Sequence, residues 1–440
     1  MAHTRLGLGI PAVLLAILAG AVSATKAEGE IPGVTGPAFA LTAKADRIST
    51  PDGHSIYFWG FTTGARAQYP GTTLIVEQGQ VVTISVTNQL PLSAGQRVSL
   101  TFPGQGDVTA ACTAGTCVSG PITLEANAGA TVTYTFTASR PGTFQYASAS
   151  QPDLQIEMGL VGALIVRPAG GASQAYAATE TAYDREYLFL LTEMDSHIHD
   201  LVEQQGVDAV YQTKLLTNYF PNYWFINGRN APDTMAENGI GRLPTQPYGA
   251  LVTMNPGQKV LMRVIGGGRA LHPFHHHGNH ARVIAVDGNL LSTQTDPVGL
   301  SHEVFTIQSV PGQTVDAIFT WTGQGLGWDA YGDPTDPMFA HQCSDVSPVD
   351  GFDDTTWEYC ADHGKKLPVK LPDLLSTDFG GFWSGSPFLG TLALLPPGQG
   401  GLNPNAGFTY MWHSHTEKEI TNFDIFPGGM MTMLVVEPRR

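Results

Sequence analysis

An internal repeat is the feature that most constrains how this chain of 440 residues folds. The segment 129–137 (GATVTYTFT) corresponds to 312–320 (GQTVDAIFT). The segment 159–168 (GLVGALIVRP) likewise corresponds to 429–438 (GMMTMLVVEP). Self-similarity of this kind indicates that one structural unit is used twice. The chain is therefore predicted to contain two copies of the same unit.

Short β-branched runs bounded by turn residues indicate the type of unit. Residues 72–88 are typical of two strands around Gln78-Gly79, and residues 251–265 repeat this pattern around Pro256-Gly257. The 51 glycines and 30 prolines supply many turns, and no long segment has helical periodicity. We therefore predict an all-β chain of two Greek-key β-sandwiches, with a long loop insertion in the second.

The repeat also suggests boundaries along the chain. We expect a signal peptide (1–27), a first sandwich (38–168), a linker (169–184) and a second sandwich (185–438) with an insertion at about 323–406. The insertion is rich in Gly, Pro, Asp and Trp and has no clear strands, so it is expected to be a folded surface excursion.

The N-terminus has the pattern of a secretory signal. Arg5 precedes an apolar run over 6–18, and small residues follow in Val22-Ser23-Ala24 and Thr25-Lys26-Ala27, either of which would suit cleavage. The run is shorter than the roughly 20 residues of a membrane span, so an uncleaved anchor is the lesser alternative. We expect a secreted, periplasmic or extracellular protein with no membrane association beyond export.

The four cysteines fit an exported protein. Their simplest pairing is two local disulfides, Cys112 with Cys117 and Cys343 with Cys360. A metal-thiolate site is the weaker interpretation, because neither pair has a CxxC spacing.

The charge balance limits the partners. Lys and Arg number 22 against 38 Asp and Glu, which gives a formal net charge of −16. This charge argues against nucleic acid and anionic membranes as partners and favours cations or neutral molecules.

Two histidine clusters in the second copy indicate a metal site. Side chains at positions i and i+2 of a strand share a face, so His275 with His277, and His413 with His415, each present two imidazoles to one side. Neutral imidazole binds copper, zinc, nickel or iron. Polar strand residues satisfied by hydrogen bonds are the alternative, but two such pairs in one sandwich favour a metal.

The string 272–278 (HPFHHHG), with Pro70-Gly71-Thr72 and the closing Gly429-Met430-Met431, resembles the multicopper oxidase family. The resemblance covers about 40–168 and 185–438 and implies cupredoxin sandwiches with copper as the cofactor.

The resemblance also implies roles for individual histidines. In the family, the first histidine of such a string binds the type 1 copper, and the later ones bind the trinuclear cluster that reduces dioxygen. The ligands so implied are a type 1 ligand, His272, and four cluster ligands: His275, His277, His413 and His415.

The sequence also departs from the family pattern. Ser414 stands where the family has the type 1 cysteine, and Glu419 stands where a further histidine is expected. In the first copy, the family's histidine pairs are replaced within 101–104 and 146–149, so four of the eight cluster ligands are missing. A blue copper site therefore cannot form on this pattern, although His272, Glu419 and Met430 or Met431 remain candidates for another ion.

Three functional interpretations stay open. In the first, the four-histidine half-site binds copper by itself and supports oxidoreductase chemistry. In the second, a second copy of this chain or another protein completes the cluster. The third is a non-catalytic copper-binding or structural surface protein on the family's fold. Catalytic residues and substrate are not indicated by the sequence.

Other histidines and carboxylates carry weaker signals. The pair His197 and His199 is expected to be an exposed polar stretch, and His276 to be a second-shell or solvent group. His280 reaches the metal only if the strand turns at Gly278. A solvated surface is favoured over cation capture for the acidic loop of Asp345, Asp350, Asp353, Asp354, Glu358 and Asp362.

The missing thiolate gives a spectroscopic prediction. Because the intense colour of blue copper is a thiolate-to-copper charge transfer, the copper-loaded protein should be colourless or faintly coloured. Its electron paramagnetic resonance spectrum should be of type 2. An intensely blue protein would refute this prediction.

Overall fold

A computed structural model describes residues 30–94, 96–170, 173–337, 339–366, 385–387 and 408–437. The predicted signal peptide and much of the predicted insertion lie outside these residues. Within them, no helix is both long enough and apolar enough to cross a membrane.

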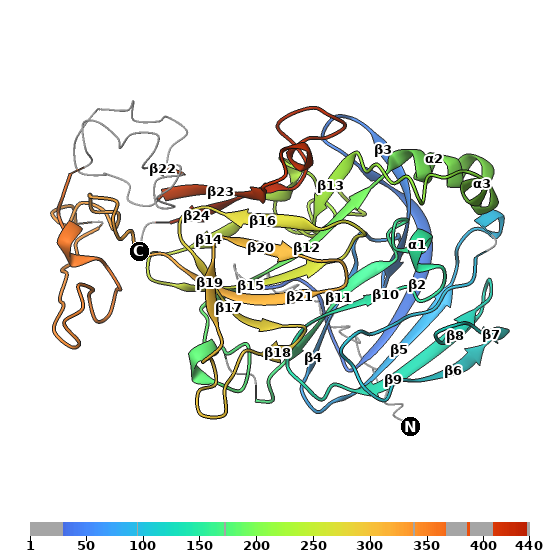
Figure 1. Ribbon diagram of the computed structural model, residues 1–440, viewed down its shortest axis with the longest axis horizontal. Coiled ribbons are helices and arrows are strands. Elements are labelled where there is room, and N and C mark those ends of the chain that lie inside the picture. Colours follow the sequence, from blue (N-terminus) through green and yellow to red (C-terminus); the bar gives the residue numbers. More distant parts are fainter. Residues whose placement is uncertain are drawn as a thin grey trace, which may run out of the picture.

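The first unit is a sandwich of two sheets (Figure 1). One sheet has the order β3-β2-β5-β9-β6 and the other β1-β4-β11-β10, while β7 and β8 form a separate hairpin. The strands are β1 (Val34–Thr35), β2 (Ala38–Ser49), β3 (Ser55–Thr62), β4 (Gly71–Glu77), β5 (Val81–Asn88), β6 (Thr109–Ala114), β7 (Cys117–Ser119), β8 (Leu124–Ala126), β9 (Thr131–Thr137), β10 (Gly142–Ala147) and β11 (Val161–Arg167).

The second unit is also a sandwich. Its sheets have the orders β13-β12-β15-β21-β17-β18, with β19 on β17, and β14-β24-β23-β16-β20, with β22 on β23. The strands are β12 (Arg185–Met194), β13 (Tyr223–Ile226), β14 (Val252–Met254), β15 (Lys259–Gly266), β16 (His272–His276), β17 (Ala281–Val286), β18 (Asn289–Leu290), β19 (His302–Val304), β20 (Thr306–Ser309), β21 (Thr314–Thr320), β22 (Gly385–Pro387), β23 (Phe408–Ser414) and β24 (Met431–Val436).

The two units repeat one topology. In the first, β2 pairs parallel with β5, and β5 pairs antiparallel with β9. In the second, β12 pairs parallel with β15, and β15 pairs antiparallel with β21. The two-residue alternation of apolar side chains builds each core: Val82, Ile84 and Val86 of β5 all point inward. The predicted all-β fold is confirmed.

A buried ion-pair network joins the two units. Arg263 of β15 is fully buried, and its Nε lies 3.0 Å from Glu186 Oε2 on β12. The guanidinium also donates to Thr143 Oγ1 on β10 of the first unit, at 3.1 Å. Thr143 Oγ1 in turn donates to Asp316 on β21. Because each charge is paired, the network can be buried between the units.

Helices occupy the connections. The helical segments are η1 (Leu92–Ala94), α1 (Pro152–Gln155), η2 (Thr179–Thr181), α2 (Ser196–Gln205), α3 (Val207–Gln212), η3 (Asp233–Met235), η4 (Cys360–Asp362) and η5 (Glu417–Ile420). The prediction of an exposed polar stretch at His197 and His199 is wrong for His199. Asp195 caps α2, and the 3.6-residue period turns His199 into the core, where Nδ1 lies 2.6 Å from the Tyr57 carbonyl oxygen.

Both predicted disulfides are confirmed. Cys112 is bonded to Cys117, between β6 and β7. Cys343 is bonded to Cys360 and closes a loop within the inserted segment. The start of that segment is anchored in the core of the second unit, because Trp328 is buried and stacks on Phe408 with 6.0 Å between ring centroids.

Candidate metal centre

The pairing of β16 with β23 positions the histidines. The register places His275 opposite His413, and Phe274 opposite Ser414. Phe274 points into the core against Phe189, with ring centroids 5.1 Å apart. Since side chains alternate between faces, the burial of Phe274 turns His275 outward.

Three imidazoles meet on the outward side. Ring nitrogens of His275, His277 and His413 lie within 4.8 Å of one another, and Nε2 of His277 is 3.2 Å from Nε2 of His413. We call these three residues the histidine cluster. His415 is exposed at its edge, with its ring centroid 5.0 Å from that of His275, and does not belong to the closest group. The structure thus brings three of the four predicted cluster ligands together and leaves the fourth nearby.

Backbone carbonyls orient two of these rings. Nδ1 of His275 lies 2.7 Å from the Phe305 carbonyl oxygen, and Nδ1 of His413 lies 2.7 Å from the Ser414 carbonyl oxygen. A carbonyl accepts only from a protonated nitrogen, so Nδ1–H is the donor and the Nε2 lone pair is left for a ligand.

The environment keeps these rings uncharged. Burial and the neighbouring imidazoles lower the pKa of His275 to about 4, chiefly through burial and His277. Burial, with His277 and His415, also lowers the pKa of His413 to about 4. Neutral imidazole is the form that coordinates a metal, so the histidine cluster suits a cation such as copper.

His272 lies in a different environment. It is buried, and its two ring nitrogens are each 2.9 Å from a carboxylate oxygen, one of Glu193 and one of Glu419. Burial lowers the pKa of His272, but the two carboxylates outweigh this effect and raise it to about 9. His272 is therefore an imidazolium held between two anions at neutral pH.

This carboxylate bridge agrees with the expectation that no type 1 copper forms at His272. Both ring nitrogens of His272 are hydrogen-bonded, so neither is left for another ion, and Ser414, at the position of the missing thiolate, donates to Glu419 Oε2 at 2.5 Å. Of the two methionines suggested as further ligands, Met430 or Met431, Met430 packs in the hydrophobic core of the second unit. A proton on His272 supplies the positive charge in this place.

The first unit has no histidines at the equivalent positions. Thr101 and Ala147 form an antiparallel backbone bridge there, as His275 and His413 do in the second unit. His276 points away from the histidine cluster as predicted, but it is buried rather than solvated, and its Nε2 lies 3.1 Å from the Val304 carbonyl oxygen. His280 is exposed and lies against Phe305.

The acidic loop of the insertion differs in part from the expectation of a solvated surface, which holds for Asp350 and Asp354. Asp353, Glu358 and Asp362 are all buried. Moreover, Glu358 belongs to a second group of side chains suited to a metal, with Asp329, His341 and His363. Sequence analysis missed this group because its members are separated by 12, 17 and 5 residues, a spacing that matches no local motif.

Solved structures with the same fold are copper proteins. The blue copper oxidase from Nitrosomonas europaea has a TM-score of 0.54 and 18% identity, over 90% of this chain and 85% of that one. The multicopper oxidase mgLAC has a TM-score of 0.54 and 18% identity, over 91% of this chain and 86% of that one. No curated protein matches the sequence. The fold is that of the cupredoxin-based copper oxidases.

The family is indicated by the sequence as well. Residues 54–171 match the family model described as multicopper oxidase. This segment therefore resembles the multicopper oxidase family, and the predicted resemblance is confirmed. The match falls in the first unit, which lacks histidines at Thr101 and Ala147, so it reflects the sandwich and not the metal ligands. The family implies copper as the cofactor.

The bridge between His272 and its carboxylates predicts a pH-dependent stability. Because its pKa is about 9 in the folded protein and about 6.5 in an unfolded chain, the stabilisation is complete below pH 6.5. It is lost as the pH rises towards 9. Wild type should lose up to about 3 kcal/mol of unfolding free energy over this range relative to His272→Gln. Urea unfolding at both pH values measures it, and identical losses in the two proteins would contradict the assignment.

Proposed function

We propose that this protein is an exported copper-binding protein that holds copper at the histidine cluster, with His415 as a further ligand. The observation that carries the proposal is the turning of the Nε2 atoms of His277 and His413 towards each other at 3.2 Å. Because Nδ1 of His413 donates to the Ser414 carbonyl, its Nε2 is an acceptor that takes either an N–H of His277 or, with His277 deprotonated at Nε2, a metal cation shared by the two rings.

The ligand set suits copper on chemical grounds. Imidazole nitrogen is a preferred ligand of copper, and the multicopper oxidase match supports this metal over others. Copper bound at such a site supplies one-electron redox chemistry with dioxygen. The protein's own contribution is to hold the neutral rings of His275 and His413 in place through the carbonyls of Phe305 and Ser414.

We therefore favour a copper-dependent oxidoreductase with an altered metal complement. The exposed ring of His415 and the 59% exposed side chain of Phe305 leave the site open on one side. The carboxylate bridge at His272 occupies the place of the type 1 copper, so electrons would not enter through such a copper. A reductant would instead transfer them directly to the copper at the histidine cluster, from its open side.

The same carboxylate bridge favours a second candidate function. Without a type 1 copper, the protein lacks the family's route for electrons into the cluster. A non-catalytic copper-binding protein, which stores or sequesters the ion, is the alternative that this observation supports.

Export is part of the proposal. The sequence pattern of residues 1–27 supports it, and so do the two disulfides, which persist in oxidising compartments. Detection of the mature protein outside the cytoplasm, with an N-terminus near residue 25 or 28, would test it.

Substitution of the cluster should remove copper. His275→Ala with His413→Ala should reduce copper retained after dialysis against a mild chelator from the wild-type content to background, because two of three close ligands are lost. Thr101→Ala and His302→Ala are the controls, since one lies at the equivalent place in the first unit and the other is an exposed histidine. Full copper retention by the double variant would show that the histidine cluster is not the site.

Assembly should govern activity. Four histidines are half of the family's ligand set, so we propose that a second copy or a partner chain completes the cluster. Copper should then cause concentration-dependent dimerisation that a chelator reverses. Light scattering with parallel oxygen uptake tests this, and a strictly monomeric protein that consumes oxygen at ordinary enzyme rates would contradict it. A copper-bound protein inert in every assembly state would favour the non-catalytic alternative.

A further inference from the structure

The inserted segment brings four ligand-bearing side chains together. The group consists of Asp329, His341, Glu358 and His363, and one ligand atom from each lies within 4.8 Å of all the others. The Cys343–Cys360 disulfide lies within the same stretch and ties the residues around His341 to those around Glu358. We call these four residues the insertion cluster.

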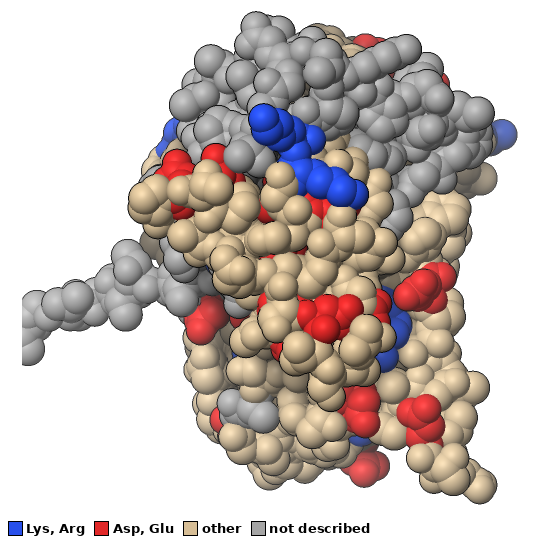
Figure 2. All heavy atoms as spheres, turned by 90° about the vertical axis from the view of Figure 1, so that its left-hand side faces the viewer, with Lys and Arg blue, Asp and Glu red and all other residues tan. Residues whose placement is uncertain are grey.

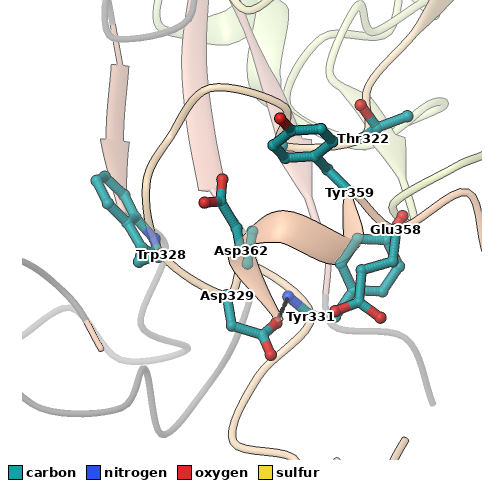
Figure 3. Close-up of a pocket in the computed structure, with 9 residues that line it drawn as sticks. Thr322, Trp328, Asp329, Tyr331, Glu358, Tyr359 and Asp362 are labelled. Carbon is teal, nitrogen blue, oxygen red and sulfur yellow. Dashed lines mark hydrogen bonds between the residues drawn. The ribbon is translucent and has the colours of Figure 1, made fainter. Parts of the chain in front are cut away.

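Two atoms of the insertion cluster are buried without a hydrogen bond. They are Nε2 of His341 and Oε2 of Glu358. Glu358 is only 2% exposed, and Asp329 only 3%. Because a buried polar atom without a partner is costly, a missing partner is indicated at this place. A pocket of about 10 Å³ is lined by Asp329 and Glu358 but by neither histidine of the cluster, so it lies next to the four ligands and not between them (Figure 3).

The separations match those around a tetrahedral ion. Nε2 of His341 lies 3.4 Å from Asp329 Oδ2 and 3.4 Å from Glu358 Oε1. Nδ1 of His363 lies 3.7 Å and 2.7 Å from the same two oxygens. Ligands at about 2.1 Å in a tetrahedron are about 3.4 Å apart. Three of the four distances are therefore close to this value or slightly longer, and only one is as short as a hydrogen bond.

Neighbouring groups orient the ligands. Nδ1 of His341 lies 2.6 Å from the Phe339 carbonyl oxygen, so the lone pair is left on Nε2, which faces the carboxylates. The two oxygens of Asp329 accept from the backbone N–H groups of Tyr331 and Gly364, at 2.9 and 2.8 Å. Such second-shell hydrogen bonds fix the direction of metal ligands.

The negative charge of the insertion cluster favours the binding of a cation. Among the described residues, the ion pairs of Asp329 and Glu358 are with His341 and His363 alone. Two carboxylates with two neutral imidazoles carry a charge of −2, which a divalent ion neutralises. Acidic side chains also outnumber basic ones on the face that bears the insertion (Figure 2), and a negative surface attracts cations.

We propose that the insertion cluster is a structural zinc site. Two imidazoles and two carboxylates in a near-tetrahedral arrangement are typical zinc ligands, and four protein ligands leave no open position for catalysis. The ion would link Asp329 to the loop of His341 and Glu358, which the Cys343–Cys360 disulfide closes. Asp329 follows Trp328, whose side chain is packed in the core of the second unit. The site shares no residue with the histidine cluster and does not depend on the proposed copper function.

Protonation of His341 is the competing state. Burial lowers the pKa of His341, but Asp329 and Glu358 outweigh it and raise the pKa to about 10 when no ion is present. An ion-pair cluster without metal is thus the alternative that an experiment must distinguish from a zinc site.

The zinc stoichiometry tests the proposal in a protein whose histidine cluster has been removed. The full-length His275→Ala/His413→Ala protein, freed of metal, should bind one zinc ion in competition with a chromophoric chelator. Addition of His341→Gln and His363→Gln should abolish this binding, whereas His280→Ala with His302→Ala, two exposed histidines, should leave it unchanged. Glu358→Gln, which keeps the shape of the side chain, should weaken binding at least about tenfold.

Two results would overturn the proposal. One is equal zinc binding with and without the His341 and His363 substitutions. The other is no zinc bound by the His275→Ala/His413→Ala protein while circular dichroism shows that it is folded. If a variant fails to fold, X-ray absorption at the zinc edge of the wild-type protein decides instead. A shell of mixed imidazole and carboxylate ligands at about 2.0 Å supports the site, and a shell of imidazoles alone refutes it.

Discussion

The pairing of β16 with β23 is the contact on which the rest of the candidate site depends. It places His275 opposite His413 and leaves their side chains on the outward side. The same register places Phe274 in the core beside Phe189, and a shift of one residue would exchange the buried and outward sets. The apolar packing therefore holds His275 and His413 in place, whereas His277 follows the end of β16 and the Phe305 carbonyl, between β19 and β20, orients the His275 ring.

The buried group of His272, Glu193 and Glu419 fills the position that corresponds to the type 1 copper of the family. Where the family has a copper ion with its thiolate, this chain has a protonated His272 between Glu193 and Glu419, with Ser414 as a donor. Two carboxylates with one imidazolium carry a net charge of −1, and the hydroxyl of Ser414 adds a hydrogen bond to Glu419, so the buried carboxylates are paired and hydrogen-bonded rather than fully neutralised. In this arrangement His272 and Ser414 supply hydrogen-bond donors to the buried carboxylates.

The two candidate metal clusters differ in ways that suit different roles. The histidine cluster is composed of imidazoles, of which His275 and His413 are neutral, and it is open at His415. The insertion cluster carries two buried carboxylates, Asp329 and Glu358, and is closed by four protein ligands. Open sites leave room for a substrate or a partner, whereas closed sites with a full ligand set contribute to stability. One chain thus combines a candidate reactive centre with a candidate structural one.

The sequence by itself determined the β-sandwich repeat, both disulfides and the two His-x-His pairs, because these depend on local alternation and short spacing. It misplaced His199, since a ten-residue helix capped by Asp195 is too short to show clear periodicity among polar residues. Only the tertiary structure decided the partners of His272, because Glu193 and Glu419 lie 79 and 147 residues away. The insertion cluster likewise depends on a chain path that only packing and the disulfide define. Charges and ligands that meet through such long-range contacts leave no periodic signal in the sequence.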